Sequence, residues 1–125
     1  MIGSCSKPRV SAYNFMKYLC ASLVKTKNVI INSTEIVNKI FDYKRAAPNE
    51  LQFLFEDIEF RTGIGNTVSY DISEGLNNLQ TFGIIGKLNH DYYLIYLTDK
   101  EADDILSDCE SVVKDMIMDL IAKCF

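Results

Sequence analysis

The chain has 125 residues, enough for one domain whose hydrophobic core needs no disulfide or metal support. Hydrophobic residues make up 48% and charged residues 24%, which are ordinary values for a globular domain. The longest apolar run is far below the roughly 20 residues of a membrane-spanning helix, and no secretory leader is recognisable. These features exclude membrane and disulfide-rich secreted classes. They predict a cytoplasmic protein with reduced thiols at four widely spaced cysteines, namely Cys5, Cys20, Cys109 and Cys124.

Charge is unevenly distributed along the chain. Residues 1–50 contain eight Lys/Arg and three Asp/Glu, a balance of +5, whereas residues 51–125 contain five and fourteen, a balance of −9. Neutralisation of phosphates by Lys and Arg supplies nearly all non-specific DNA affinity. The acidic half is therefore poorly suited to contact nucleic acid, although it contains the most informative pattern in the sequence.

The first quarter of the sequence predicts an arm, a helix and a short strand. Residues 1–10 are expected to form a loosely held arm. The hydroxyl of Ser11 can cap a helix, and Lys25 and Lys27 suit its carbonyl end. Residues 28–31 are β-prone and are expected to form a small strand that pairs with a later hairpin. The core-facing side of the helix is predicted from three- and four-residue spacing of Ala12, Phe15, Met16, Leu19, Cys20 and Leu23.

The next segment predicts two further helices and a break. A second helix is capped by Asn32 and runs to about Arg45. It ends before Pro48, because proline disfavours helix in the residue that precedes it. A third helix is expected from Asn49 to Arg61, and the glycines of residues 62–66 then interrupt the chain.

A helix followed by a hairpin organises the second half of the sequence. A helix is predicted over residues 71–82 from the spacing of Ile72, Leu76 and Leu79. Gly83 can adopt the left-handed conformation that ends a helix. Two strands, over residues 84–88 and 92–97, are expected to pair around a turn at residues 89–91.

A final helix is predicted over residues 98–124, with Thr98 as its cap. Its apolar stripe is wider than one small core requires, so part of it is expected to pack on a partner subunit. This helix is therefore the predicted dimerisation element. The stripe consists of Ile105, Cys109, Val112, Met116 and Leu120, widened by Leu106, Val113, Ile117 and Ile121.

One family resemblance follows from the helix and hairpin. In the sequence, Ile72, Ser73, Leu76, Leu79, Gly83, Ile84 and Ile85 fit in register the pattern apolar-Ser-x-x-Leu-x-x-Leu-x-x-x-Gly-Leu-Ile. The pattern Tyr-x-Leu-Thr-x-x-Gly is matched approximately by Tyr93, Tyr96, Leu97 and Thr98, with Glu101 in place of glycine. Both patterns are typical of winged helix-turn-helix regulators of the MarR and PadR type, which the stretch from Asn49 to Leu106 resembles. The resemblance implies a mainly α fold with a small β-hairpin, extended by extra N-terminal and long C-terminal helices.

Two features of the pattern disfavour the family's usual contact with DNA. A recognition helix reads bases with Arg, Lys, Asn or Gln and is steered by basic neighbours. The exposed positions of the predicted helix contain no Lys or Arg, being Asp71, Ser73, Glu74, Asn77, Asn78 and Gln80. In the following hairpin, Lys87 and His90 are offset by Asp91.

The leading hypothesis is a non-enzymatic winged-helix protein that acts through protein–protein contacts. It would be a small adaptor, or an inhibitor encoded by a phage or another mobile element, that occupies a basic nucleic-acid-binding surface of its target. Its predicted partner-binding residues are Asp71, Glu74, Asn77, Asn78, Lys87, His90 and Tyr92.

The alternative hypothesis is a dimeric DNA-binding transcriptional regulator, as the resemblance implies. Base contacts would come from Ser73, Asn77 and Asn78 on the predicted recognition helix. Phosphate contacts would come from the basic N-terminal half, through Lys7, Arg9, Lys39, Lys44 and Arg45. This alternative becomes the better one if those cations lie on the same face as residues 71–82.

No catalytic, cofactor-binding or metal-binding residue is predicted. His90 is interpreted as a polar turn residue rather than a ligand or pH sensor, and Cys20 and Cys109 as core residues rather than metal ligands. The Gly63-Ile64-Gly65 segment has no following Lys-Ser or Lys-Thr, unlike a phosphate-binding loop. Three carboxylates without a histidine partner are interpreted as the solvated side of the third helix, namely Glu56, Asp57 and Glu59.

The tyrosines of the last predicted strand leave one question open. Tyr92, Tyr93 and Tyr96 flank Leu94 and Ile95, so both faces of this strand are apolar. A strand with one solvated face should alternate with polar residues. The simpler interpretation is that the final helix covers the second face, and the alternative is an aromatic contact patch for another protein.

Overall fold

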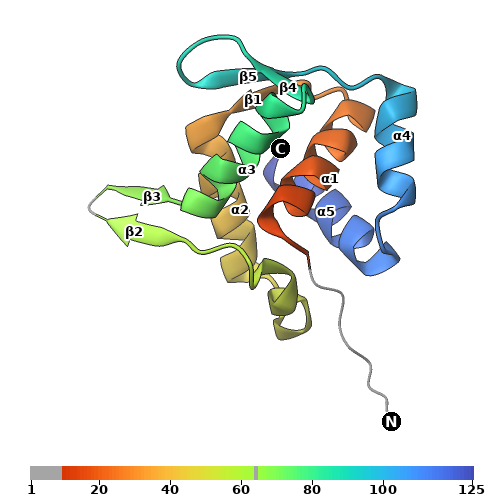
Figure 1. Cartoon of the computed structure of the whole chain (residues 1–125). Helices are drawn as coiled ribbons and strands as arrows, with labels where there is room; N and C mark the ends of the chain where they lie inside the picture. The colour runs from red at the N-terminus through yellow and green to blue at the C-terminus, as the bar shows by residue number, and fades with distance from the viewer. Residues whose placement is uncertain (1–9, 64) are drawn as a thin grey trace.

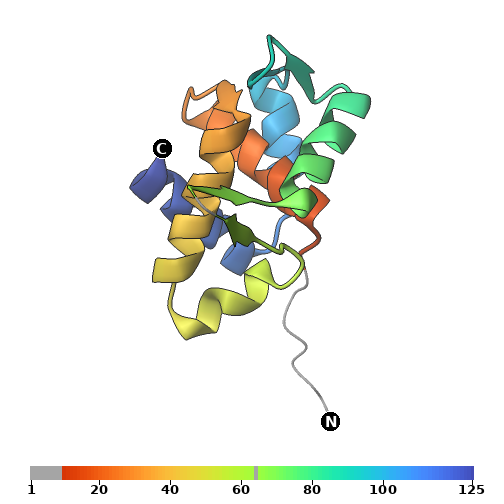
Figure 2. The ribbon, with the colours of Figure 1, turned by 90° about the vertical axis from the view of Figure 1, so that its left-hand side faces the viewer.

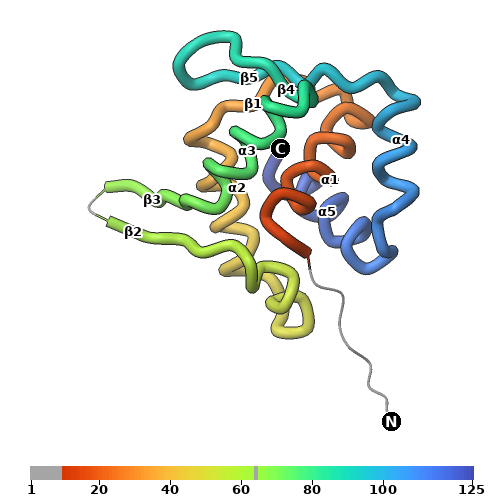
Figure 3. Tube along the Cα trace, in the orientation of Figure 1, coloured from red at the N-terminus to blue at the C-terminus, as the bar shows by residue number. Residues whose placement is uncertain are grey.

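The computed structural model describes residues 10–63 and 65–125, and the fold is mainly helical with small antiparallel sheets (Figure 1). Figure 3 traces the path of the chain through these elements. The arm predicted for residues 1–10 lies outside the described residues except for Val10, which is buried. In chain order the elements are α1 (Ala12–Lys25), β1 (Ile30–Asn32), α2 (Ser33–Ala46), the 3-10 helix η1 (Asn49–Phe55), β2 (Arg61–Gly63), β3 (Asn66–Val68), α3 (Tyr70–Thr81), β4 (Ile85–Lys87), β5 (Tyr92–Ile95), α4 (Asp99–Ser107) and α5 (Ser111–Cys124).

The first two helices begin at the predicted caps. The side chain of Ser11 accepts a hydrogen bond from the backbone N–H of Asn14, at 3.1 Å. The side-chain oxygen of Asn32 accepts from the N–H groups of Thr34 and Glu35, at 3.0 and 2.9 Å. These bonds satisfy N–H groups that have no partner within the helix, which is why both helices start where the sequence predicts.

The third predicted helix, from Asn49 to Arg61, is wrong beyond Phe55. Only residues 49–55 are helical, as a 3-10 helix, and Arg61–Gly63 instead pairs with Asn66–Val68 in a hairpin. The apolar spacing that suggested a helix reflects burial of Leu54, Phe55 and Ile58 in the core. The predicted solvated helix side at Glu56, Asp57 and Glu59 is therefore absent, because these residues are not helical.

A three-stranded antiparallel sheet has the order β1-β5-β4. Its inner face consists of the buried side chains of Ile31, Ile85, Tyr93 and Ile95. Helices α1, α2 and α3 lie on this side of the sheet, as the two ribbon views show (Figures 1 and 2). The predicted small strand pairs with the hairpin as expected, and Gly83 takes the expected left-handed conformation, with φ at +78°.

The single C-terminal helix predicted over residues 98–124 is wrong, because the chain turns between Ser107 and Ser111 and forms two helices. Helix α5 packs on α1 and α2 (Figure 1). A continuous helix would carry its second half away from the core and leave that apolar stripe exposed to water. Most of the stripe is buried within the chain, through Val113, Met116, Ile117, Leu120 and Ile121, whereas Val112 is 38% exposed.

Candidate contact surface

Helix α3 presents a polar side to solvent. Ser69 caps it, since its hydroxyl oxygen accepts from the N–H of Ile72 at 3.2 Å. The inward residues Ile72, Gly75, Leu76 and Leu79 are buried, and α3 packs mainly against α1. As predicted, Ser73, Glu74, Asn77, Asn78 and Gln80 are exposed, and no residue of α3 is a cation.

Asp71 has a structural role as well as a place on this surface. It is half-buried, and its carboxylate accepts a hydrogen bond from the backbone N–H of Glu59 at 2.8 Å. This bond holds the segment before β2 against the start of α3. Because its side chain is half-buried, Asp71 is less available to a partner than Glu74, which is exposed.

A hollow of about 630 Å³ lies between the β2–β3 hairpin and the start of α3. Tyr70 lines this hollow, and its side chain is 68% exposed. Its hydroxyl is hydrogen-bonded to Glu74, which raises the pKa of Tyr70 above its ordinary value because the carboxylate disfavours the phenolate. The sequence did not indicate this hollow, because its hairpin was not predicted. It is lined by Glu59, Arg61, Val68, Ser69, Tyr70, Asp71 and Ser73.

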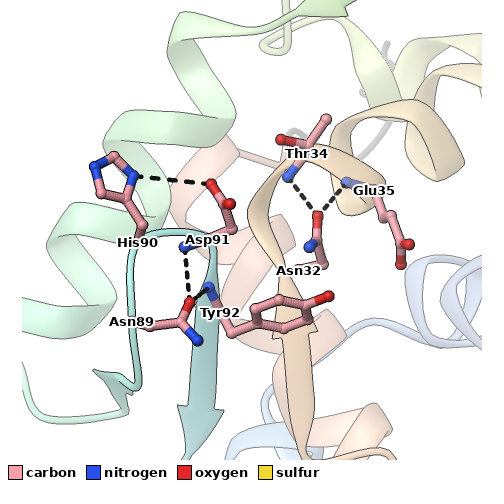
Figure 4. Close-up of polar contacts among 7 residues, drawn as sticks. All are labelled: Asn32, Thr34, Glu35, Asn89, His90, Asp91 and Tyr92. Atoms are coloured by element: carbon pink, nitrogen blue, oxygen red, sulfur yellow. Dashed lines mark hydrogen bonds and ion pairs between the residues drawn. The ribbon is translucent and has the colours of Figure 1, made fainter.

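The turn between β4 and β5 is held by local hydrogen bonds (Figure 4). The side-chain oxygen of Asn89 accepts from the N–H groups of Asp91 and Tyr92, at 3.0 and 3.3 Å. The carbonyl of Asp91 accepts from the N–H of Ser33 at 2.8 Å, which fixes the turn to the start of α2. The side chain of His90 is 97% exposed, and its Nδ1 lies 3.9 Å from the Asp91 carboxylate. His90 and Lys87 are thus exposed to solvent at the β4–β5 turn.

The cations proposed for the DNA-binding alternative contact aromatic rings. Lys39 lies over the ring of Phe125, with its Nζ 4.2 Å from the ring centroid. Lys44 and Arg45 lie over the rings of Phe60 and Phe41, at 5.7 and 5.6 Å. Within the described part of the chain, no hydrogen bond or ion pair joins these three cations to α3. Lys7 and Arg9 lie outside the described residues.

Tyr92 lies on the solvent side of the three-stranded sheet rather than beside α3. It shares this side with Leu94 and Tyr96, because alternate residues of a strand point to the same face. Ile30 stands opposite Leu94, and the N–H of Leu88 donates to the carbonyl of Tyr92 at 2.9 Å. We refer to Ile30, Leu88, Tyr92, Leu94 and Tyr96 as the outer sheet face.

The outer sheet face is open to solvent. Ile30, Tyr96 and Leu88 are 57%, 55% and 51% exposed. The final helix was expected to cover this face, and that interpretation is wrong, because α4 and α5 pack on α1 and α2 instead. The described residues therefore leave this face open.

The remaining chemical candidates are isolated from one another. Burial raises the pKa of the Cys20 thiol to about 12, and burial also raises the pKa of Cys109 and Cys124. Across residues 10–63 and 65–125, no three His, Cys, Asp or Glu side chains come together as metal ligands would. None of the helices in these ranges has the length and apolar character needed to cross a bilayer.

Comparison with protein-family models, with curated proteins and with solved structures found no match in any of the three.

Proposed function

We propose that the chain is a winged-helix protein without enzymatic activity that acts by binding another protein. The fold proposal is supported by the order of the elements, in which α3 serves as the recognition helix and the β4–β5 hairpin as the wing. Strand β1 pairs with the second strand of that hairpin, as expected for this arrangement. One departure is clear: residues 47–69, including η1 and the β2–β3 hairpin, stand where a helix-turn-helix has a turn of about 3–4 residues.

The observation that carries the proposal is the absence of cations from the exposed side of α3. Glu74 projects from the middle of this side, and Asn77 and Asn78 follow one turn later. A duplex docked here would bring phosphates towards the carboxylates of Glu74 and Asp71, which repel them. A protein surface rich in Lys and Arg would instead be electrostatically complementary.

The neighbouring elements extend this surface. The β2–β3 and β4–β5 hairpins project to the same side of the molecule, on either side of α3 (Figures 1 and 2). Tyr70 offers an exposed ring of the type that forms the centre of protein interfaces, and Lys87 and His90 lie at the edge. The proposed role is that of an adaptor, or of an inhibitor that occupies the basic nucleic-acid-binding surface of its target.

A DNA-binding measurement tests this proposal directly. Fluorescence anisotropy of a labelled duplex should show no binding by the purified chain at micromolar concentrations, in low or moderate salt. Non-specific DNA binding through several phosphate contacts would instead fall by about 10³–10⁵ in affinity between 50 and 200 mM salt. Such a steep dependence would contradict the proposal. It would favour a DNA-binding regulator that uses Ser73, Asn77 and Asn78.

A charge-reversal pair tests the protein contact. Partners captured by the immobilised wild-type chain should be released by Glu74→Lys, because the substitution opposes a basic partner surface. Asp104→Lys makes the same charge change on α4 and should leave capture intact. Captured partners should also lose the ability to bind nucleic acid while the chain is bound. Equal capture by both variants would contradict the assignment of this surface to α3.

A further inference from the structure

The outer sheet face is an apolar surface that spans all three strands of the sheet. Leu94 lies at its centre, because β5 is the middle strand. The end of the Tyr96 ring lies directly over Gly86 in β4, in space that any side chain at residue 86 would occupy. Glycine thus allows the tyrosine to lie flat on the sheet instead of projecting into solvent. The result is a group of aromatic and aliphatic side chains that extends across the three strands.

The side chains of the outer sheet face are uncharged. None of its five side chains is a carboxylate, ammonium or guanidinium group. The residues paired with Tyr92 and Leu94 on the neighbouring strands, Asn32 and Gly86, are uncharged as well. The chain has a net charge of −4, and the exposed residues of α4 include Asp99, Glu101, Asp103 and Asp104. Two copies that met through such acidic surfaces would repel each other, whereas the five side chains of the outer sheet face carry no charge. Glu35 and Lys39, which line a hollow with Ile30, border the face and have opposite charges.

The area of the face is adequate for the centre of a stable interface. Ile30, Leu88, Tyr92 and Tyr96 are between 41% and 57% exposed. At roughly 150–250 Å² for each large side chain, these four expose about 300–500 Å² together. A standard interface buries about 800 Å² on each partner, of which somewhat more than half is apolar. The face therefore supplies most of the apolar area that one such interface requires.

From these observations we propose that the outer sheet face binds the same face of a second copy of this chain, forming a two-fold symmetric dimer. A two-fold contact is self-complementary, so it needs a surface that tolerates its own charge and shape. The two sheets would stack face to face at a separation of about 10 Å, as sheets in β-sandwiches do. This dimer leaves the exposed side of α3 accessible, so the α3 part of the partner contact proposed above stays open. The two contacts meet at the β4–β5 hairpin, where Leu88 and Tyr92 belong to the dimer face and Lys87 and His90 to the edge of the partner surface.

Analytical ultracentrifugation under reducing conditions tests the dimer. The wild-type chain should sediment with twice its mass of 14.2 kDa at the upper end of the micromolar range. Ile30→Lys and Leu88→Lys should each raise the dimer dissociation constant by about 100-fold or more, because they place like charges together in the interface. The matched control is Val68→Lys, a residue of β3 that is 51% exposed and lies outside the face. It should leave the dissociation constant unchanged.

Folding of each variant is checked by circular dichroism and thermal melting. Leu88→Lys lies next to the β4–β5 turn, so it keeps the test valid if Ile30→Lys disturbs the short strand β1. A monomeric wild-type chain throughout the micromolar range would overturn the proposal, whether or not another protein binds this face. A dimer that survives both substitutions, or that is lost in Val68→Lys, would overturn it as well, since the contact would then lie elsewhere.

Discussion

Replacing Leu120 with alanine tests whether α5 belongs to the core of its own chain. Leu120 is fully buried, whereas Met118 on the same helix is 39% exposed. Truncation of a fully buried leucine typically costs 2–5 kcal/mol, so we expect about 3 kcal/mol for Leu120→Ala. For a chain of this length that corresponds to a fall of roughly 10 °C in Tm. Met118→Ala should change the free energy of unfolding by no more than about 0.5 kcal/mol.

The assay is urea denaturation followed by circular dichroism, performed at two protein concentrations. The difference in unfolding free energy between wild type and Leu120→Ala should be the same at both, because α5 packs within one chain. Any concentration dependence from association through the outer sheet face is common to both proteins and cancels. The packing described for α5 would be refuted by equal effects of the two substitutions. It would also be refuted by a loss that depends on protein concentration.

Three further predictions follow from caps, burial and charge. Hydrogen bonds from Thr98 lower the pKa of Glu101 from its ordinary value of 4.5. The bond from the backbone N–H of Thr98 has the larger effect, and the bond from its side chain the smaller. The Glu101 carboxylate therefore stabilises the fold fully at pH values above the ordinary carboxyl pKa, and this stabilisation is lost as pH falls through the lowered pKa. Glu101→Gln should accordingly make the free energy of unfolding less dependent on pH in the acidic range. Because burial raises the pKa of Cys20 to about 12, it should be the slowest of the described cysteines to react with iodoacetamide, as followed by mass spectrometry. Glu74→Lys combined with Asn77→Lys should create duplex DNA affinity in low salt if α3 occupies the position of a recognition helix.

Each of these three predictions would be contradicted by a specific result. An unchanged acid limb in Glu101→Gln would show that the capping carboxylate does not couple to folding. Rapid labelling of Cys20 in native protein would mean that α1 opens readily. For the DNA measurement, Asp104→Lys with Ser107→Lys adds the same charge to α4. Equal binding by the two double variants would remove support for α3 as a recognition helix.

Local signals in the sequence determined the positions of several elements. Ser11, Asn32 and Thr98 cap helices that begin at the next residue, and Gly83 ends α3 in the left-handed conformation. Caps and tight turns act through hydrogen bonds between residues two to four positions apart. The chain therefore encodes them within a few residues, whatever the rest of the fold does.

The segment between α2 and α3 could not be predicted in this way. Apolar spacing over residues 49–61 recorded which side chains are buried, but not the backbone conformation that buries them. That conformation depends on Asp71, whose carboxylate binds the N–H of Glu59 twelve positions earlier. It also depends on the Gln52 side chain, which donates to the carbonyls of Lys44 and Ala47 at 2.8 and 3.0 Å.

Only the tertiary structure decided which apolar surfaces are covered. The hydroxyl of Tyr43 donates to the carboxylate of Asp119 at 2.7 Å, across 76 positions of sequence, where α5 packs beside α2. Helix α5 therefore lies against the helices and leaves the outer sheet face open. Apolar periodicity specifies that a side chain should leave water, but it does not specify the partner that removes it. That choice depends on which helix occupies the limited space around the core, so it is a property of the whole packed chain.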